Sequence, residues 1–350
     1  MKKLILFTVF LFVLQIVNAQ FNRQYSTKDG LSGTSINKII QDKRGFLWIA
    51  TNNGLNKFDG DRFTYFGIGD GHENGLTDNL ITSLFIDIES RLWIGTHSGV
   101  WSFSLITEKF SSYPVVVNDN LIFDFFVTDI AQNSKNELYI STSGRGIKKL
   151  NISKNIFETD SGLEKSIPTQ FVKRIFFDKQ NTLYATVENN GIYIYDSASN
   201  TAQHYTSYNS NIAENQIVAI ASGRRNQIYI GTTGGISIYN KQSASFETMV
   251  DSRGLTVANL FFAPDSTMFV STDGNGIFFI NNENQLQKFN PVNNLANDFI
   301  NKTFSLLVDK DYNIWCGINY KGLMMLGKPE SLFYNIDCKS GLGGISDMCV

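Results

Sequence analysis

The histidines and cysteines are the residues from which a metal centre or a nucleophilic site would be built, and the sequence has three of each. They are His72, His97 and His204, and Cys316, Cys338 and Cys349. No two histidines stand at the spacing of metal ligands, and their order suggests no Cys–His or Ser–His–Asp arrangement. The cysteines, separated by 22 and 11 residues, fit no zinc-binding pattern. The sequence therefore predicts no catalytic residue and no metal site.

Three glycine-containing segments have some features of phosphate loops or enzyme motifs. The segments "GRG" at Gly144 and "GLGG" at Gly341 are followed by no helical pattern, so neither has the helix N-terminus that a phosphate loop requires. The segment "STDGNG" at Ser271 is similar to the Asp-box of sialidase propellers, but it lacks the glycine two places after the Asp and the following Thr-Trp. We interpret it as a turn, and we expect no cofactor.

The chain is organised by an internal repeat with an aromatic residue at its centre. The aromatic lies in segments such as "LWIAT", "LWIGT", "LYIST" and "IWCGI". Its seven copies are Trp48, Trp93, Tyr139, Tyr184, Tyr229, Phe269 and Trp315, spaced by 45, 46, 45, 45, 40 and 46 residues. Six or seven residues after each aromatic stands a glycine, at Gly54, Gly99, Gly146, Gly191, Gly235, Gly276 and Gly322. Two markers that recur together seven times indicate a repeat architecture.

Each unit contains four segments with β-strand patterns. An apolar first segment ("INKIIQD" at Ile36) precedes the aromatic one, a third alternates apolar and mixed residues after the glycine, and a fourth is short and aromatic ("FTYF"). Four antiparallel strands in about 45 residues, repeated seven times, predict an all-β fold, a seven-bladed β-propeller of four-stranded blades. The glycines are expected to adopt positive φ in the turn between second and third strands.

The central aromatics have two possible roles. The first is packing between neighbouring blades, where burial of one ring is worth about 2–3 kcal/mol. The second is a stacking platform for a sugar, and we favour packing for each ring. Cys316 fills the place of Ile49 and Ile94 in its repeat, so we expect it to be a core residue.

The ends of the chain follow from counting outer strands. The segment "FNRQY" at Phe21 has the outer-strand pattern, and the segment "LFYN" at Leu332 has it too, which makes eight copies for seven blades. If residues 21–25 complete the seventh blade, the ring closes without an open edge. The sequence from Asp337 onward, "DCKSGLGGISDMCV", resembles "STKDGLSGTSINKI" and would then start an eighth repeat. We therefore predict a propeller over residues 20–337 and the truncated start of a further repeat, and of a next propeller, over 338–350.

The first residues and the overall charge limit where the chain works. Lys2 and Lys3 precede an apolar run from Leu4 to Val17, and Ala19 follows, which is the pattern of a secretory signal peptide over residues 1–19. The alternative, an uncleaved membrane anchor, is disfavoured because the run is shorter than the ~20 residues of a spanning helix. Thirty basic and 32 acidic residues give a net charge of −2 without a long basic run. We expect export across the cytoplasmic membrane, and no nucleic-acid partner.

The first two units resemble a known family. The stretch "DGLSGTSINKIIQDKRGFLWIATNNGLNKFDGDRFTYF" is similar to the repeat of the two-component regulator propellers, which occur in periplasmic sensors of hybrid two-component systems of Bacteroidetes. The shared features are the "GLS" or "GLT" opening, an apolar segment that ends in Asp42 or Asp87, and the "LWI.T..G" segment. Units three to six keep the spacing but lose the Trp and much of the "GL" opening.

The resemblance implies a function and a set of partners. It implies a sensor with two propellers in tandem, a small β-sandwich, one membrane span and a histidine kinase, often with receiver and DNA-binding domains. It further implies an oligosaccharide or other small glycan-derived ligand. On this reading the chain is a periplasmic ligand sensor without catalysis. It passes its signal through a second propeller or β-sandwich to a kinase outside these residues, and the membrane is reached only through that C-terminal region. The alternative is a secreted propeller lyase or glycosidase that acts on polysaccharide.

The candidate ligand contacts lie in the loops of one face. Loops that join second to third strands, and outer strands to the next blade, emerge together around the mouth of the axial channel. On that face we expect ligand contacts among His97, Arg145, Glu188, Asn189, Asp273, Asn275, Asn319, Tyr320 and Lys321. Arg145 and the "NYK" run of residues 319–321 stand out, because other blades have small turn residues there. The alternative for each is a solvated turn residue.

Overall fold

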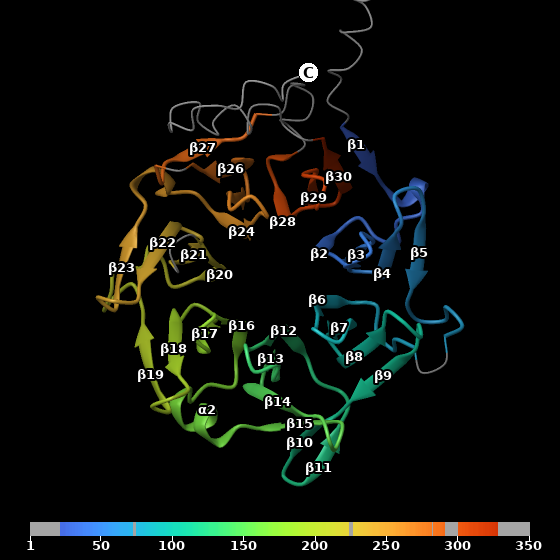
Figure 1. The fold of residues 1–350 in the computed structure, drawn as a ribbon, viewed down its shortest axis with the longest axis horizontal. Helices are drawn as coiled ribbons and strands as arrows, with labels where there is room; N and C mark the ends of the chain where they lie inside the picture. Colours follow the sequence, from blue (N-terminus) through green and yellow to red (C-terminus); the bar gives the residue numbers. More distant parts are fainter. Residues whose placement is uncertain (1–21, 73–74, 224–226, 282, 291–299, 328–350) are drawn as a thin grey trace, which may run out of the picture.

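Seven β-sheets are arranged in a closed ring around a central axis (Figure 1). A computed structural model describes residues 22–72, 75–223, 227–281, 283–290 and 300–327. The predicted signal peptide and the predicted start of an eighth repeat lie outside these residues. In five of the seven sheets the order of strands follows the sequence from the axis outward, and every adjacent pair in the repeated unit is antiparallel. The prediction of an all-β seven-bladed propeller is therefore confirmed.

The first, second and fourth blades are built from consecutive segments of the chain. The first contains β2 (Ile36–Gln41), β3 (Leu47–Thr51), β4 (Gly54–Phe58) and β5 (Phe63–Phe66). The second contains β6 (Ile81–Ile86), β7 (Arg91–Thr96), β8 (Gly99–Ser104) and β9 (Phe110–Tyr113). The fourth contains β16 (Val172–Phe177), β17 (Thr182–Val187), β18 (Ile192–Asp196) and β19 (Thr201–Tyr205).

The fifth and sixth blades follow the same plan. The fifth contains β20 (Ile217–Ser222), β21 (Ile228–Thr232), β22 (Gly235–Asn240) and β23 (Ser245–Thr248). The sixth contains β24 (Val257–Phe262), β25 (Met268–Thr272), β26 (Ile277–Ile280) and β27 (Leu286–Lys288). The 40-residue spacing between the aromatics of these two repeats is thus accommodated without loss of a strand.

The seventh blade joins the two ends of the ring. It contains β28 (Thr303–Val308), β29 (Ile314–Ile318) and β30 (Gly322–Leu326) from one end of the described chain and β1 (Arg23–Tyr25) from the other. Strands β1 and β30 are antiparallel, with Arg23 opposite Met325 and Tyr25 opposite Leu323. In Figure 1 β1 lies beside β30 at the outer edge. The expected closure by the N-terminal outer strand is confirmed, and the segment at Leu332 lies outside the described residues.

The third blade departs from the predicted four strands. Its strands β12 (Val127–Gln132), β13 (Leu138–Thr142), β14 (Ile147–Asn151) and β15 (Ile156–Thr159) are extended outward by β10 (Val115–Val117) and β11 (Asn120–Ile122), which gives six. The hairpin of β10 and β11 precedes the blade in sequence, and β10 pairs parallel to β15. The valines of β10 follow almost directly on β9, the outer strand of the second blade. The repeat pattern therefore does not predict the hairpin.

Short helical turns occur only in connections between strands of the described chain. They are α2 (Ser161–Ser166), η1 (Thr27–Asp29) and η3 (Val250–Ser252). In α2 the Asp160 side chain accepts hydrogen bonds from the backbone N–H groups of Gly162 and Leu163, which is the usual N-cap arrangement. A helix of six residues is too short to leave a 3.6-residue period in the sequence.

A buried aspartate at the end of the inner strand explains the "D…LW" spacing. The carboxylates of Asp42, Asp87 and Asp309 each accept a hydrogen bond from the indole N–H of the tryptophan six residues later, at 3.2, 2.7 and 2.8 Å. The same carboxylates accept backbone N–H groups of the turn between inner and second strands. A single carboxylate therefore fixes both the turn and the orientation of the ring.

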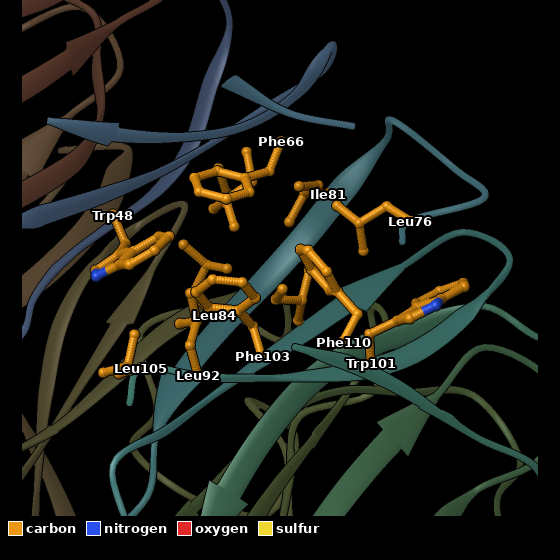
Figure 2. Packing of buried hydrophobic residues seen from close by; sticks show 13 residues of the cluster. Trp48, Phe66, Leu76, Ile81, Leu84, Leu92, Trp101, Phe103, Leu105 and Phe110 are labelled. Atoms are coloured by element: carbon orange, nitrogen blue, oxygen red, sulfur yellow. The ribbon is translucent and has the colours of Figure 1, made fainter. Parts of the chain in front are cut away.

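The central aromatics pack between blades, as predicted. Trp48 of β3 lies 5.5 Å from Phe103 of β8 in the next blade, measured between ring centroids, within a cluster shared by the two blades (Figure 2). Trp315 of the seventh blade meets Phe58 of the first at 5.7 Å. The seven aromatics are at most 5% exposed, which rules them out as sugar platforms on the surface. Cys316 is likewise fully buried, and burial raises the pKa of its thiol.

A threonine and a glycine close the turn between the second and third strands. The Thr51 hydroxyl donates to the carbonyl of Gly54 at 2.8 Å and accepts the N–H of Asn53. The threonines of the second, third, fifth and sixth blades repeat the first of these bonds. All seven glycines have positive φ, from 67° to 143°, which confirms the expectation from sequence.

Gly322 tests the closure of the ring, because a Cβ built on it would lie 2.3 Å from the carbonyl oxygen of Tyr25 in β1. We expect Gly322→Ala to lower the free energy of unfolding in urea by about 1–3 kcal/mol more than Gly60→Ala. Gly60 has a similar φ of +107° but nothing within 4 Å of its Cβ position, so it isolates the cost of the backbone conformation. Equal losses in the two variants would show that close approach of β1 contributes nothing.

Asp87 tests the carboxylate–indole hydrogen bond. In Asp87→Ala the indole N–H of Trp93 loses its acceptor inside the core, and the backbone N–H of Arg91 loses one as well, so we expect a loss of about 2–4 kcal/mol in urea unfolding. The control is Glu89→Ala, which removes an exposed carboxylate 3.0 Å from the same Arg91 side chain and should change stability by less than about 0.5 kcal/mol. Similar values for both variants would contradict the role given to Asp87.

Candidate functional site

One cavity occupies the mouth of the axial channel. Its volume is about 580 Å³, and its lining comes from the starts of the inner strands and the ends of the second strands. The predicted loop arrangement holds, since the N–H of the turn glycine in one blade donates to the loop that leads into the next. Examples are the bonds from Gly54 to Asn79, from Gly191 to Asn215 and from Gly322 to Thr34, at 2.7, 3.1 and 3.1 Å. Both kinds of loop therefore meet on this face.

A β-bulge at one position of every inner strand shapes the wall of the channel. In all seven blades the register with the second strand shifts after the first residue of the inner strand, as at Ile36/Lys38 in β2 and Val172/Arg174 in β16. A bulge turns an extra side chain out of the regular alternation. Consecutive residues of the strand, such as Asn37 and Lys38, can therefore both line the channel.

The bulged residues form a ring at the mouth that has a polar and an apolar half. In blades one to seven they are Asn37, Thr82, Thr128, Lys173, Val218, Ala258 and Phe304, and all seven line the mouth cavity. The first three donate to the inner strand of the next blade, to the carbonyls of Ile81, Val127 and Val172, each at 2.6 Å. The fifth to seventh cannot donate through their side chains. The ring of bulged residues is therefore hydrogen-bonding on one side and hydrophobic on the other, and polar loop residues such as Asp273 and Asn319 line the mouth next to its hydrophobic side.

Aromatic and charged side chains surround the bulged residues. The rings of His97 and Phe126 lie 4.0 Å apart between centroids, and Phe304 is 39% exposed on the opposite, apolar half. Lys173 forms an ion pair with Glu188 at 3.6 Å, and Asp273 forms one with Lys302 at 3.9 Å. Rings with accessible faces beside charged and amide groups are the composition of a small-ligand site.

Three of the nine candidate contacts from sequence line the mouth cavity, and a fourth lies beside it. His97, Asp273 and Asn319 are in the lining, and Glu188 is connected to it through Lys173. Arg145 instead lines a separate cavity of about 510 Å³ on the third blade, between the β10–β11 hairpin and α2. The structure therefore does not bring Arg145 together with the others.

The remaining four candidates lie in turns. Asn189 and Tyr320 occupy the left-handed region, at φ +52° and +58°, and Tyr320 is 77% exposed. The backbone N–H of Asn275 donates to the Thr272 hydroxyl, and that of Lys321 donates to the carbonyl of Ile318. Their backbones have roles in the turns, and their side chains face solvent at the same end of the ring.

Sequence reasoning missed the inner-strand residues of the site. Besides the bulged residues, the channel wall carries Lys38, Asp129 and Arg174, which follow them directly. The pairs "NK", "TD" and "KR" interrupt otherwise apolar inner strands. Such neighbouring polar residues break the two-residue alternation, and this break was the available signal.

The described part of the chain contains no cluster of three or more His, Cys, Asp or Glu that could hold a metal ion. Over the same ranges no helix has the length and apolar character needed to cross a bilayer.

Comparison with known proteins connects the first two blades to a family. The family model described as two component regulator propeller matches residues 30–53 and 75–98. These segments include the loop before the inner strand, the turn held by Asp42 or Asp87, and the second strand with its tryptophan. A histidine kinase of Formosa agariphila is 43% identical over 63 residues, which is 18% of this chain and 5% of that kinase.

Solved structures share the whole fold. The extracellular domain of a hybrid two component system of B. thetaiotaomicron superposes with a TM-score of 0.77 at 22% identity, over 89% of this chain and 42% of that one. A virginiamycin B lyase of Staphylococcus aureus superposes with a TM-score of 0.65 at 13% identity, over 88% and 99%. At these identities the likenesses show the fold alone, and the chain spans less than half of the sensor domain. Two segments in the first blades of this closed ring of seven blades thus match the two component regulator propeller repeat.

Proposed function

We propose that the chain is a ligand-sensing propeller, without catalysis, of a two-component signalling protein in the periplasm. Its ligand is a glycan-derived oligosaccharide bound at the mouth of the axial channel. The observation that carries the proposal is a mouth cavity in which aromatic and hydrophobic side chains lie beside amide and charged groups. The family repeats and the likeness to an extracellular sensor domain support it.

The polar and the aromatic side chains of the mouth suit the two kinds of surface on a sugar. Hydroxyl groups need donors and acceptors. Asn319 supplies both, Asp273 accepts, and the bulged residues of the first blades accept through their side-chain oxygens, since a donor of each is already bonded to the next blade. The C–H faces of a pyranose ring pack on aromatic rings, and Phe304 and the His97–Phe126 pair offer such faces. A cavity of about 580 Å³ has the size of typical small-ligand pockets.

The alternative, a polysaccharide lyase or glycosidase, finds less support. A glycosidase generally needs two carboxyl groups that flank the scissile bond. Each carboxylate at or beside this site instead has a cation as its partner: Asp129 with Arg174, Glu188 with Lys173 and Asp273 with Lys302. The lyase with this fold is only 13% identical, and this carries no activity over to the present chain.

The signal must reach a kinase outside this chain through an adjoining module, a second propeller or a β-sandwich. A closed ring in which every blade is packed against two others has no hinge of its own. A ligand can shift only an element that has two arrangements. We therefore place the change at the packing of the mouth face against that module.

Substitution at the mouth tests the site. We expect His97→Ala and Asn319→Ala each to weaken binding of the activating oligosaccharide about tenfold in calorimetry of the complete ectodomain, or about 1.4 kcal/mol. Arg62→Ala, which removes an 84% exposed side chain of the first blade, should leave binding unchanged. The variants Arg145→Ala and Tyr320→Ala test whether the cavity of the third blade and the turn at Tyr320 contribute to ligand binding. Unchanged binding in both mouth variants would refute the site, and degradation of polysaccharide by the purified protein would refute the sensor role.

The packing mechanism has a separate test. We expect a chain that ends near residue 337 to fold as a monomer and to bind the oligosaccharide at least tenfold more weakly than the complete ectodomain, because part of the site is covered by the next module. Calorimetry on both proteins with the same ligand measures the difference. Equal and tight affinities would place the whole site in one propeller, and the packing mechanism would then be wrong.

A further inference from the structure

Three charged side chains lie inside the axial channel below the mouth. The channel holds a second cavity of about 580 Å³, and Lys38, Asp129 and Arg174 are the charged residues of its lining among the described residues. They come from the first, third and fourth blades and occupy equivalent positions, directly after the bulged residue. Most of the remaining lining is hydrophobic, with Asn37, Gln41, Gln132 and Asn259 as its amides. The channel thus contains two cations and one carboxylate.

The carboxylate is engaged by only one of the two cations. Oxygen Oδ1 of Asp129 lies 4.0 Å from the Arg174 guanidinium, and Oδ2 accepts the backbone N–H of Ile175 at 3.3 Å. Arg174 also donates through Nε to the carbonyl of Val218 at 3.4 Å. Within the described chain no hydrogen bond or ion pair reaches the Lys38 ammonium. The Lys38 ammonium therefore has no partner at contact distance, and Asp129 acts on it only through its charge.

An unpaired ammonium in a narrow channel is costly to the protein. Burial lowers the pKa of Lys38, Asp129 opposes this effect and Arg174 adds to it. A cation that is partly removed from water gains most from a nearby anion that restores the lost interactions. A carboxylate or sulfate group that enters the channel from the mouth would supply such an anion to both Lys38 and Arg174.

We propose that the axial channel binds the oxyanion group of an acidic sugar through Lys38 and Arg174. This deepens the proposed function, since it gives the ligand an acidic end that points into the channel while its neutral part lies at the mouth. The mouth and channel cavities adjoin each other at Asn37, Arg174, Val218 and Phe304, which line both. A sugar that carries a carboxylate can therefore contact both levels at once.

The test uses D-glucuronate and D-glucose as probes, since they differ by the carboxylate. In calorimetry on the purified chain at constant ionic strength, we expect glucuronate to bind at least tenfold more tightly than glucose. Lys38→Met should remove most of this preference, and Lys38→Arg should keep it. Lys43→Met makes the same change at an exposed position of the first blade outside both cavities, and should leave the preference intact. Inorganic sulfate at the same concentrations reports binding of a free oxyanion.

Asp129→Asn provides a test in the opposite direction. The amide oxygen can still accept the N–H of Ile175, but the channel loses its negative charge, so glucuronate should bind several-fold more tightly. Equal binding of glucose and glucuronate, no binding of any anionic probe, or an undiminished preference in folded Lys38→Met would each overturn the inference. The sensor proposal survives these results if the complete ectodomain still binds a neutral oligosaccharide through His97 and Asn319.

Discussion

The hydrogen bond between a buried aspartate and the indole of the next strand is the interaction on which the first, second and seventh blades depend. In Asp42, Asp87 and Asp309 one carboxylate holds the turn between two strands and sets the ring that packs on the neighbouring blade. Tyr184 uses its hydroxyl on Asp178 in the same way, and burial together with this carboxylate raises the pKa of the tyrosine. Where the aspartate is absent, as at Ala263 before Phe269, the ring packs without a polar partner. The shape of the ring therefore rests on packing oriented by a few buried charges.

Much of this could be read from the sequence because it depends on local geometry that recurs. The seven aromatics, the glycines with positive φ and the outer strand at the N-terminus each leave a residue-level signature, and the structure confirms all three. The hairpin of β10 and β11 left none, since Val115–Val117 looks like more of the preceding strand. The bulges were not predicted either, because one inserted residue in a six-residue strand looks like an ordinary irregularity of the apolar–polar alternation. The charged side chains of the channel were therefore not predicted. Loop residues such as Arg145 were assigned to one site because they belong to one face, although they line different cavities.

The repeat itself provides an internal control for deciding which residues the fold requires. The position after the bulge is Lys38, Ser83, Asp129, Arg174, Ala219, Asn259 and Ser305 in successive blades. All seven positions meet the same backbone geometry, and four of them are filled by small or neutral side chains. The hydroxyls of Ser83 and Ser305 make no hydrogen bond in the described chain, so a polar group is not needed there for stability. The propeller fold therefore does not require charged residues at the other three positions.

The charged residues at these three positions cost free energy, and no contact within the ring fully compensates for it. Two cations around one carboxylate in a channel leave a net positive charge where the surrounding strands are mostly hydrophobic, and burial lowers the pKa of Lys38 accordingly. A neutral residue would remove that cost, as Ala219 does in the fifth blade. Because a rigid ring presents these groups in fixed positions, an entering anion meets them without any reorganisation of the blades. The channel charges are thus most simply understood as part of recognition, placed on the most rigid element that the fold offers.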